Sequence, residues 1–310
     1  MHNSQEGLEI DPDGPRAGLL KSTCKGCHSN SVNDSTVVES NGSIIPMVFN
    51  TSSEPTNPLA GGNFYWMVFD GGDRMGHNVL DTSTLVDATL GMTPPGGTEL
   101  TGSRMSCAGT TGCHGNHLIV GSGNGGSDTT AMSGAHHSAD NTIDGSTIGK
   151  SFRFLEEVDG IEDNDWEQTP TSTEHNVYKG SARTDENDND PPDTISSLCG
   201  RCHGDFHHGT GNVSGNSAAW GTPWVRHPTD FDMSTELNNS NIDYPSTYDT
   251  DVPIAYSNID TPADEIIMCL SCHRAHGSPN ESILRWDYRG WPANSATVTN
   301  GCGICHTDKN

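Results

Sequence analysis

Cys269-Leu-Ser-Cys272-His273 and Cys302-Gly-Ile-Cys305-His306 lie near the end of the chain and share one spacing. The same spacing, C-x-x-C-H, occurs in Cys24-Lys-Gly-Cys27-His28 and in Cys199-Gly-Arg-Cys202-His203. Residues i, i+3 and i+4 share one face of a helical turn. Two thiols and one imidazole therefore meet on one side, as required to hold a haem by two thioethers and ligate its iron.

Two other uses of paired cysteines fit this pattern less well. Pairs of C-x-x-C elements form tetrahedral zinc sites, but zinc does not require a His after the second Cys in each of four motifs. Disulfide scaffolds belong to short secreted chains, and this chain has 310 residues. We therefore predict four haem attachment sites, with thioethers at Cys24, Cys27, Cys199, Cys202, Cys269, Cys272, Cys302 and Cys305 and iron ligands at His28, His203, His273 and His306.

The remaining two cysteines suggest a fifth site. Cys107 and Cys113 are separated by five residues, and His114 follows Cys113 directly. Five residues cannot lie on one helical turn, but Gly109 and Gly112 allow a loop to bulge outward. We predict a non-standard attachment site here, which gives five haems of the c type. The alternative is a Cys107–Cys113 disulfide, which leaves four.

The chain has too few apolar side chains to form a core from them alone. Leu, Ile, Val and Phe total 50 of the 310 residues, below the ~20 % under which charged chains are usually disordered. A formal net charge of -26 adds self-repulsion. We therefore expect the haems to form the core. The predicted fold is mostly irregular with short α-helices and little β-structure, wrapped around a closely packed chain of haems.

Short helices are expected at the attachment motifs. The stretch Thr261–Cys269 offers an N-cap, a Pro at the first helical position and acidic residues in the first turn. A similar short helix is expected over Asp193–Cys199, which follows two prolines. The apolar and aromatic run Gly62–Phe69 is expected either to line a haem pocket or to form a buried strand.

The attachment sites begin at residues 24, 107, 199, 269 and 302, so no fixed repeat is visible. We place a soft boundary near residue 150. It separates an N-terminal haem-binding region, 1–150 with haems 1 and 2, from a C-terminal one, 151–310 with haems 3 to 5, within one continuous haem-cored unit. The acidic stretch 184–193 is interpreted as a solvated loop, with calcium binding as the alternative.

Ten histidines remain once the five motif histidines are assigned, twice what His/His ligation of five irons requires. This surplus favours bis-histidine haems. The nine methionines are rival ligands, but they have no recurring placement near the motifs and are better explained as packing residues. The candidate distal ligands are His77, His117, His136, His137, His175, His207, His208, His227 and His276.

His276 lies three residues after the motif ligand His273. A tether of this length spans ~10 Å at most, so the His276 ring can hardly pass around its own porphyrin. We therefore expect His276 to ligate a neighbouring haem and to bring two macrocycles near contact.

These features resemble the extracellular multihaem cytochromes of metal-reducing prokaryotes, particularly the outer-surface cytochromes that polymerise into conductive filaments. Besides the four motifs, the resemblance rests on Leu59–Trp66 with Gly76-His-Asn78, Met132–His137 with Gly145-Ser-Thr, and Cys202–His208 with Arg226-His-Pro228. The long spacing between Cys107 and Cys113 departs from the family pattern.

The resemblance implies bis-His haems in parallel-stacked and T-shaped pairs. Its distal ligands would stand at His77, His137, His207 or His208, His227 and His276. It also implies a head-to-tail filament of copies of this chain, in which His2 or His175 could ligate a haem of the adjacent subunit.

The expected location follows from where such haems are attached, which is outside the cytoplasmic membrane. We expect an extracellular or cell-surface protein that was exported and lost its signal peptide, with the periplasm as the alternative. No apolar stretch approaches 18 residues, so no membrane span is expected. A pI near 4.6 argues against nucleic acid as a partner.

The predicted function is electron transfer to redox partner proteins or extracellular acceptors, without catalysis. A multihaem oxidoreductase needs an open iron, and the five-haem nitrite reductases mark theirs with C-x-x-C-K. Here a His follows the second Cys of every motif. A monomeric periplasmic electron shuttle is the main alternative to the filament.

Overall fold

The chain is seen in a computed structural model, which describes all five attachment motifs and most of the segments around them. The described residues are 4–5, 8–9, 24–40, 43–79, 87, 90–97, 100, 104–120, 131–132, 143–183, 191–207, 212–213, 224–225, 227–234, 244–290 and 301–306. His136, His137, His208 and residues 184–190 of the predicted acidic loop lie outside them.

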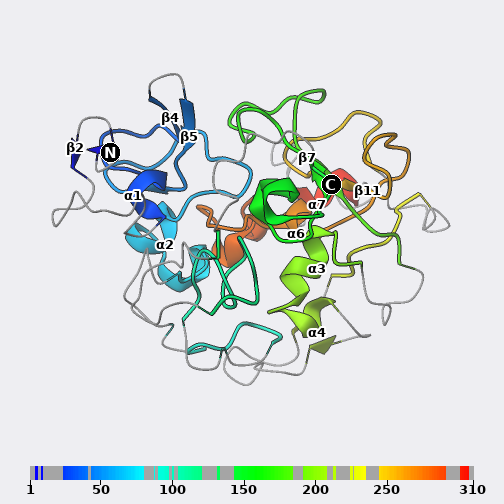
Figure 1. The fold of residues 1–310 in the computed structure, drawn as a ribbon. Coiled ribbons are helices and arrows are strands. Elements are labelled where there is room, and N and C mark those ends of the chain that lie inside the picture. The colour runs from blue at the N-terminus through cyan, green and yellow to red at the C-terminus, as the bar shows by residue number, and fades with distance from the viewer. Residues whose placement is uncertain are drawn as a thin grey trace.

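The α-helices of the described part are four to six residues long. They are α1 (Lys25–His28), α2 (Tyr65–Phe69), α3 (Ile195–Gly200), α4 (Gly204–His207), α6 (Cys269–Cys272) and α7 (Gly301–Cys305). Short 3-10 turns accompany them at η1 (Gly72–Met75), η2 (Ile148–Lys150), η3 (Phe152–Phe154), η4 (Glu281–Ile283) and η5 (Tyr288–Gly290). In Figure 1, α1 and α2 lie on one side with β4 and β5, and α3, α4, α6 and α7 gather on the other.

The strands are short and form small separate sheets. They are β1 (Ser4–Gln5), β2 (Leu8–Glu9), β3 (Ser29–Asn30), β4 (Val37–Ser40), β5 (Ser43–Pro46), β6 (Phe49–Asn50), β7 (Gly160–Ile161), β8 (Val177–Lys179), β9 (Asn212–Val213), β10 (Trp224–Val225) and β11 (Ala255–Tyr256). The antiparallel pairs are β1 with β2, β4 with β5, and β9 with β10, while β3 pairs with β6 in parallel. In the one larger sheet that the described residues form, β8 lies between β7, antiparallel, and β11, parallel.

The apolar interior of the described residues is divided into small clusters. One gathers on Tyr178, Val158 and Ile266, a second on Met233 and Tyr244 of the C-terminal part, and others lie near α2 and near residue 131. The prediction of a mostly irregular fold with short helices and little β-structure is therefore confirmed. No described helix has the length and apolar character needed to span a bilayer.

Helix α3 agrees with its prediction, and the segment before α6 does not. Thr194 is the N-cap of α3, and its Oγ1 accepts a hydrogen bond from the Ser197 amide at 3.1 Å. The helix predicted over Thr261–Cys269 is wrong. Ile266 and Ala255 exchange two backbone hydrogen bonds of 2.9 Å, which hold this segment extended. Burial of Ile266 against the Tyr178 cluster overrides the local capping signals.

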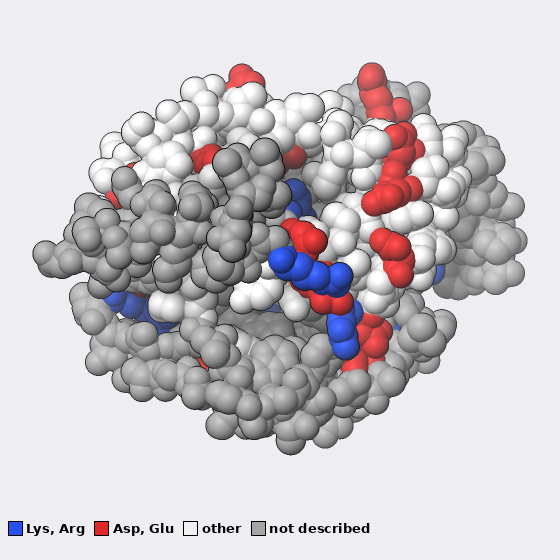
Figure 2. Space-filling model, turned by 180° about the vertical axis from the view of Figure 1, so that it is seen from behind, with Lys and Arg blue, Asp and Glu red and all other residues white. Residues whose placement is uncertain are grey.

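The aromatic run at Gly62–Phe69 is not a strand, because Tyr65–Phe69 forms α2. Trp66 and Met67 are its buried residues, and the Trp66 indole donates to Glu54 at 2.7 Å. The face drawn in Figure 2 shows acidic side chains along one side, and a small group of basic side chains beside acidic ones near the middle. This mixture fits a strongly acidic chain in which several basic groups lie beside carboxylates.

Candidate haem sites

In all five motifs the backbone closes in the same way. The motif His donates its amide to the carbonyl of the first Cys, and this bond brings the imidazole back beside both thiols. The lengths are 3.0 Å for His28 to Cys24, 3.0 Å for His114 to Cys107, 3.0 Å for His203 to Cys199, 3.1 Å for His273 to Cys269 and 2.8 Å for His306 to Cys302. The long-spaced motif is thus closed as the regular ones are.

The long-spaced motif has five residues between its cysteines, three more than the regular motifs, and they leave the turn as a bulge. Gly109 has φ +89°, which only glycine adopts readily, and it accepts from the Gly112 amide at 2.9 Å. A Cβ at Gly112 would lie 2.5 Å from the Ala108 amide nitrogen. The Cys113 amide then donates to Cys107 at 3.2 Å, matching the 3.1 Å bond from Cys27 to Cys24 in the first motif.

Four motif imidazoles are held by a second contact, from Nδ1 to a backbone carbonyl. Because a carbonyl can only accept, the Nδ1 atoms carry the protons and Nε2 keeps its lone pair for a metal. The bonds join His28 to Pro46 at 2.9 Å, His114 to Arg153 at 3.0 Å, His203 to Pro95 at 2.8 Å and His273 to Ser282 at 2.9 Å. The donor set therefore suits iron ligation through Nε2.

Three motif rings face a second imidazole. The ring centroids are 6.3 Å apart for His114 and His276, 6.1 Å for His203 and His77, and 6.1 Å for His306 and His227. A metal bound at ~2 Å from one nitrogen of each ring requires centroids roughly 6 Å apart. The chain therefore fits haem iron with two histidine ligands at these three positions.

Burial favours the neutral form of five candidate imidazoles. It lowers the pKa of His203 to about 4, with a further decrease from His77. It lowers the pKa of His276 to about 3, and nearby His114 adds to this effect. Burial also lowers the pKa of His77, His114 and His273. Neutral rings are the form that binds a metal.

The thiols of successive motifs lie close to one another. Cys199 and Cys269 share a hydrogen bond, which raises the pKa of the first thiol and lowers that of the second. Burial and then Cys202 raise the pKa of Cys113 to about 11. Burial and the nearby Cys302 and Cys305 raise the pKa of Cys272 to about 12. Haems attached at these residues would have neighbouring edges.

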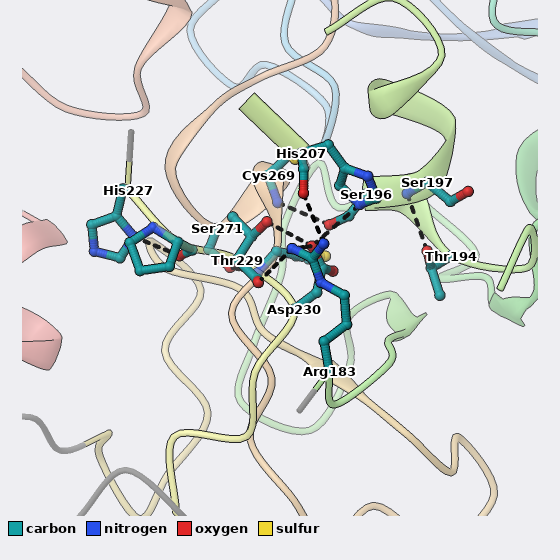
Figure 3. A network of polar contacts seen from close by, with 12 residues as sticks. Arg183, Thr194, Ser196, Ser197, His207, His227, Thr229, Asp230, Cys269 and Ser271 are labelled. Carbon is teal, nitrogen blue, oxygen red and sulfur yellow. Dashed lines mark hydrogen bonds and ion pairs between the residues drawn. The ribbon is translucent and has the colours of Figure 1, made fainter. Parts of the chain in front are cut away.

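His207 takes part in a buried polar network beside these thiols (Figure 3). Its Nε2 lies 3.6 Å from Asp230 Oδ2, and Arg183 Nη2 lies 3.6 Å from the same oxygen. Arg183 also donates to the backbone carbonyls of His207 at 2.7 Å and Thr229 at 3.0 Å. The structure thus places His207 against a carboxylate.

The other candidate histidines differ in what their nitrogens contact. Both ring nitrogens of His117 contact protein groups: Nε2 lies 2.9 Å from the Cys113 carbonyl oxygen, and Nδ1 lies 3.2 Å from Glu156 Oε2. His175 donates Nδ1 to Asn176 at 2.8 Å and stacks on Tyr248 with centroids 3.5 Å apart. His227 is exposed, and its Nδ1 donates to Pro228 at 2.7 Å.

Sequence reasoning missed the residues whose carbonyls orient the motif imidazoles. Two of them, Arg153 and Ser282, have φ of +49° and +59°, in the left-handed region. A backbone carbonyl needs no particular side chain, so no residue type marks it. Two of the four acceptors are prolines, Pro46 and Pro95, but a proline in a sequence does not indicate a contact with histidine.

The five closed motifs, the neutral imidazoles and the facing rings match what a multihaem c-type cytochrome requires. A family model described as "Doubled CXXCH motif" matches residues 261–310, which hold the last two motifs. Over its whole length the chain resembles the C-type cytochrome OmcS of Geobacter sulfurreducens. The two are 24 % identical over an alignment 370 residues long, which covers 100 % of this chain and 82 % of OmcS. The resemblance to outer-surface multihaem cytochromes is thus confirmed.

Two solved structures show a looser likeness. An outer membrane cytochrome S filament from Geobacter sulfurreducens has a TM-score of 0.49 and 18 % identity, covering 93 % of this chain and 82 % of that one. The OmcS nanowires of the same organism have a TM-score of 0.42 and 19 % identity, covering 92 % and 81 %. Scores below 0.5 do not by themselves establish a shared fold.

Proposed function

We propose that this chain carries electrons along five covalently attached haems, each with two histidine ligands. The observation that carries the proposal is the common closure of all five motifs together with the three facing imidazole pairs. When bound, haem supplies an iron that alternates between Fe(III) and Fe(II). The chain's own residues would attach it, orient it and exclude water from it.

The count of five includes the site at Cys107, Cys113 and His114. Its support is the amide bond from His114 to Cys107, which a disulfide would not require, and the second imidazole, His276, in front of the ring. His114 also donates Nδ1 to a backbone carbonyl, as three of the regular motif histidines do. A Cys107–Cys113 disulfide leaves these three features without a purpose.

We assign distal ligands where rings face each other: His276 opposite His114, His77 opposite His203, and His227 opposite His306. The partners of His28 and His273 remain among His136, His137, His175, His207 and His208. We do not assign His117, because both of its nitrogens are engaged by protein groups.

The haems would follow one another in the order of the sequence. Burial lowers the pKa of His114 and His276, and His28 contributes to both decreases, which supports a first motif lying near the second. Contacts between thiols support the same order along the rest of the chain. Cys113 lies near Cys202 of the third motif, Cys199 near Cys269 of the fourth, and Cys272 near Cys302 of the fifth. We propose that residues 1–150 and 151–310 hold one continuous haem chain, since these contacts cross residue 150.

Electron carriage is favoured over catalysis because an enzyme needs an iron with an open position. Three of the five motif rings already face a second imidazole. Spare histidines are available for the other two.

We further propose an extracellular location and a head-to-tail polymer. The support is the whole-length similarity to OmcS, whose solved form is called a nanowire. A repeating contact that does not close produces an open filament. In such a polymer, His175 or His2 would be available as a distal ligand for a haem of the adjacent subunit. A monomeric shuttle remains the competing form.

Intact mass and carbon monoxide binding test the haem assignment. We expect the mass of the native protein to show five haems, and the reduced protein to bind no carbon monoxide. Four haems would contradict the site at Cys107 and Cys113. One equivalent of bound carbon monoxide would reveal an open iron and support an oxidoreductase.

Electron microscopy of the native protein tests the polymer. Because the chain carries a net charge of -26, copies repel one another and added salt should favour assembly. We expect filaments at moderate salt. Discrete monomer-sized particles at every salt and protein concentration would contradict the polymer and leave electron transfer intact.

A further inference from the structure

Four glycines meet where three backbone segments cross, and we call this place the glycine junction. It consists of Gly61, Gly62, Gly76 and Gly277. Gly62 forms a parallel bridge with Gly277, and Gly76 forms an antiparallel bridge with the same residue. The segment around Gly277 is therefore held between two other segments of the chain.

The backbones of two candidate distal ligands, His77 and His276, are hydrogen-bonded to each other in the junction. The His77 amide donates to the His276 carbonyl at 3.2 Å, and His77 Nδ1 donates to the Ala275 carbonyl at 2.5 Å. On its other side, His276 donates its amide to Gly61 at 2.6 Å. The backbones that carry the two imidazoles thus form one hydrogen-bonded unit.

The close approach leaves no room for side chains. A Cβ at Gly277 would lie 2.6 Å from the Asn63 carbonyl oxygen and 2.8 Å from that of Met75. A Cβ at Gly76 would lie 2.7 Å from the His276 carbonyl oxygen. These neighbours are backbone atoms, which cannot rotate away as a flexible side chain can. Neither glycine has a left-handed φ, so the contact itself requires glycine.

We propose that the glycine junction is a positioning device that locks the distal ligands of two different haems to each other. This rests on the proposed bis-histidine haems, in which His276 faces His114 and His77 faces His203. Since both distal ligands belong to one backbone unit, neither ring can shift without displacing the other. The junction fixes the separation of two irons through protein bonds as well as through haem packing.

The proposal distinguishes a change in the junction from a change in one ligand. Loss of the His77 ring removes one distal ligand but leaves its backbone bond to His276. An added methyl group at Gly277 separates the backbones on both sides and displaces both rings. At Gly61, a Cβ would lie 3.0 Å from His276 Nδ1, so that position affects the His276 ring alone.

The test uses the haem-loaded protein. Intact mass and carbon monoxide binding of the unmodified protein come first, because missing haems or an open iron there would contradict the proposed function and not the junction. In Gly277→Ala we expect all haems to be retained and two of them to change together, in low-spin electron paramagnetic resonance signals and in midpoint potentials. In His77→Ala and in Gly61→Ala we expect one haem to change.

Gly91→Ala is the control, since Gly91 is exposed and a Cβ there meets nothing within 4 Å, and we expect no haem to change. If Gly277→Ala does not accumulate, Gly76→Ala probes the junction from the opposite side with the same expected pair. A change in no haem, in one haem only, or an unselective loss of haems would overturn the positioning role.

Discussion

The bulged motif Cys107–His114 and the regular motif Cys269–His273 reach the same local geometry through different backbones. His114 donates Nδ1 to Arg153 at 3.0 Å, and the next amide, of Gly115, donates to Phe154 at 2.8 Å. His273 donates Nδ1 to Ser282 at 2.9 Å, and the next amide, of Arg274, donates to Ile283 at 2.9 Å. The two sites repeat one contact pattern.

The turns that accept these bonds are also alike. Arg153 and Phe154 have φ of +49° and +59°, and Ser282 and Ile283 have φ of +59° and +52°. Two successive left-handed residues without glycine are unusual, and a β-branched Ile there is more so. At these two sites the imidazole and its acceptor turn are the same, while the spacing between the cysteines differs.

Deleting each attachment site in turn gives the largest expected effect. Cys113→Ala with His114→Ala should remove one haem from the intact mass, and so should Cys272→Ala with His273→Ala. Equal losses would show that the bulged motif attaches haem as the regular one does. An unchanged haem count in the first variant would break the comparison and favour a disulfide.

Removal of one distal ligand, which leaves an open coordination position on one iron, should have the next largest effect. His276→Ala removes the ring that faces His114, so the reduced variant should bind one equivalent of carbon monoxide. His117→Ala is the control, because this nearby His contacts the Cys113 carbonyl and Glu156 instead. Should the control variant bind carbon monoxide and the His276 variant not, the assignment of the distal ligand is reversed.

A methyl group in the bulge should have a partial and local effect. At Gly112, a Cβ would lie within 2.6 Å of three backbone atoms of Ala108. We expect Gly112→Ala to lower the occupancy of the haem at this site and to leave the regular sites full. Peptide mass mapping measures the occupancy of each motif, with Gly91→Ala as the unaffected reference. Full occupancy at every motif would show that the bulge tolerates distortion.

The smallest effect concerns the acceptor turn of the regular site. Ser282 is exposed and has φ +59°, so its side chain packs against little. Ser282→Gly should keep or slightly raise the free energy of unfolding, and Ser282→Val should lower it by about 1 kcal/mol relative to the Gly variant. The urea midpoint of the haem-loaded protein measures this difference. Equal midpoints would mean that the turn is not held left-handed.

The sequence predicts the local closure of the motifs better than the path of the chain. Spacing marks the cysteines and motif histidines as candidates because a haem demands fixed residue types at fixed offsets, and in all five motifs the His amide bonds to the first Cys. The helix expected at Thr261 was wrong, since Ile266 pairs with Ala255 and is buried. Such a contact depends on tertiary packing that local capping rules do not contain.

The facing imidazoles could be predicted only in part. His276 was expected to ligate a neighbouring haem because its tether is too short, and it faces His114 far away in the sequence. Which His faces which motif depends on long-range placement, for example by the Pro95 carbonyl at His203. The residues that supply such carbonyls carry no common side chain that a sequence could show.

The contact between Cys199 and Cys269 bears on how the protein is made. In a chain that folded before its haems were attached, these two thiols would be half-buried and hydrogen-bonded to each other, and therefore less accessible to an attachment enzyme. Oxidation would then join them as a disulfide between two motifs and block both sites. We therefore expect haem attachment to precede folding. Protein produced without the attachment machinery should accumulate a Cys199–Cys269 crosslink that non-reducing peptide mapping detects.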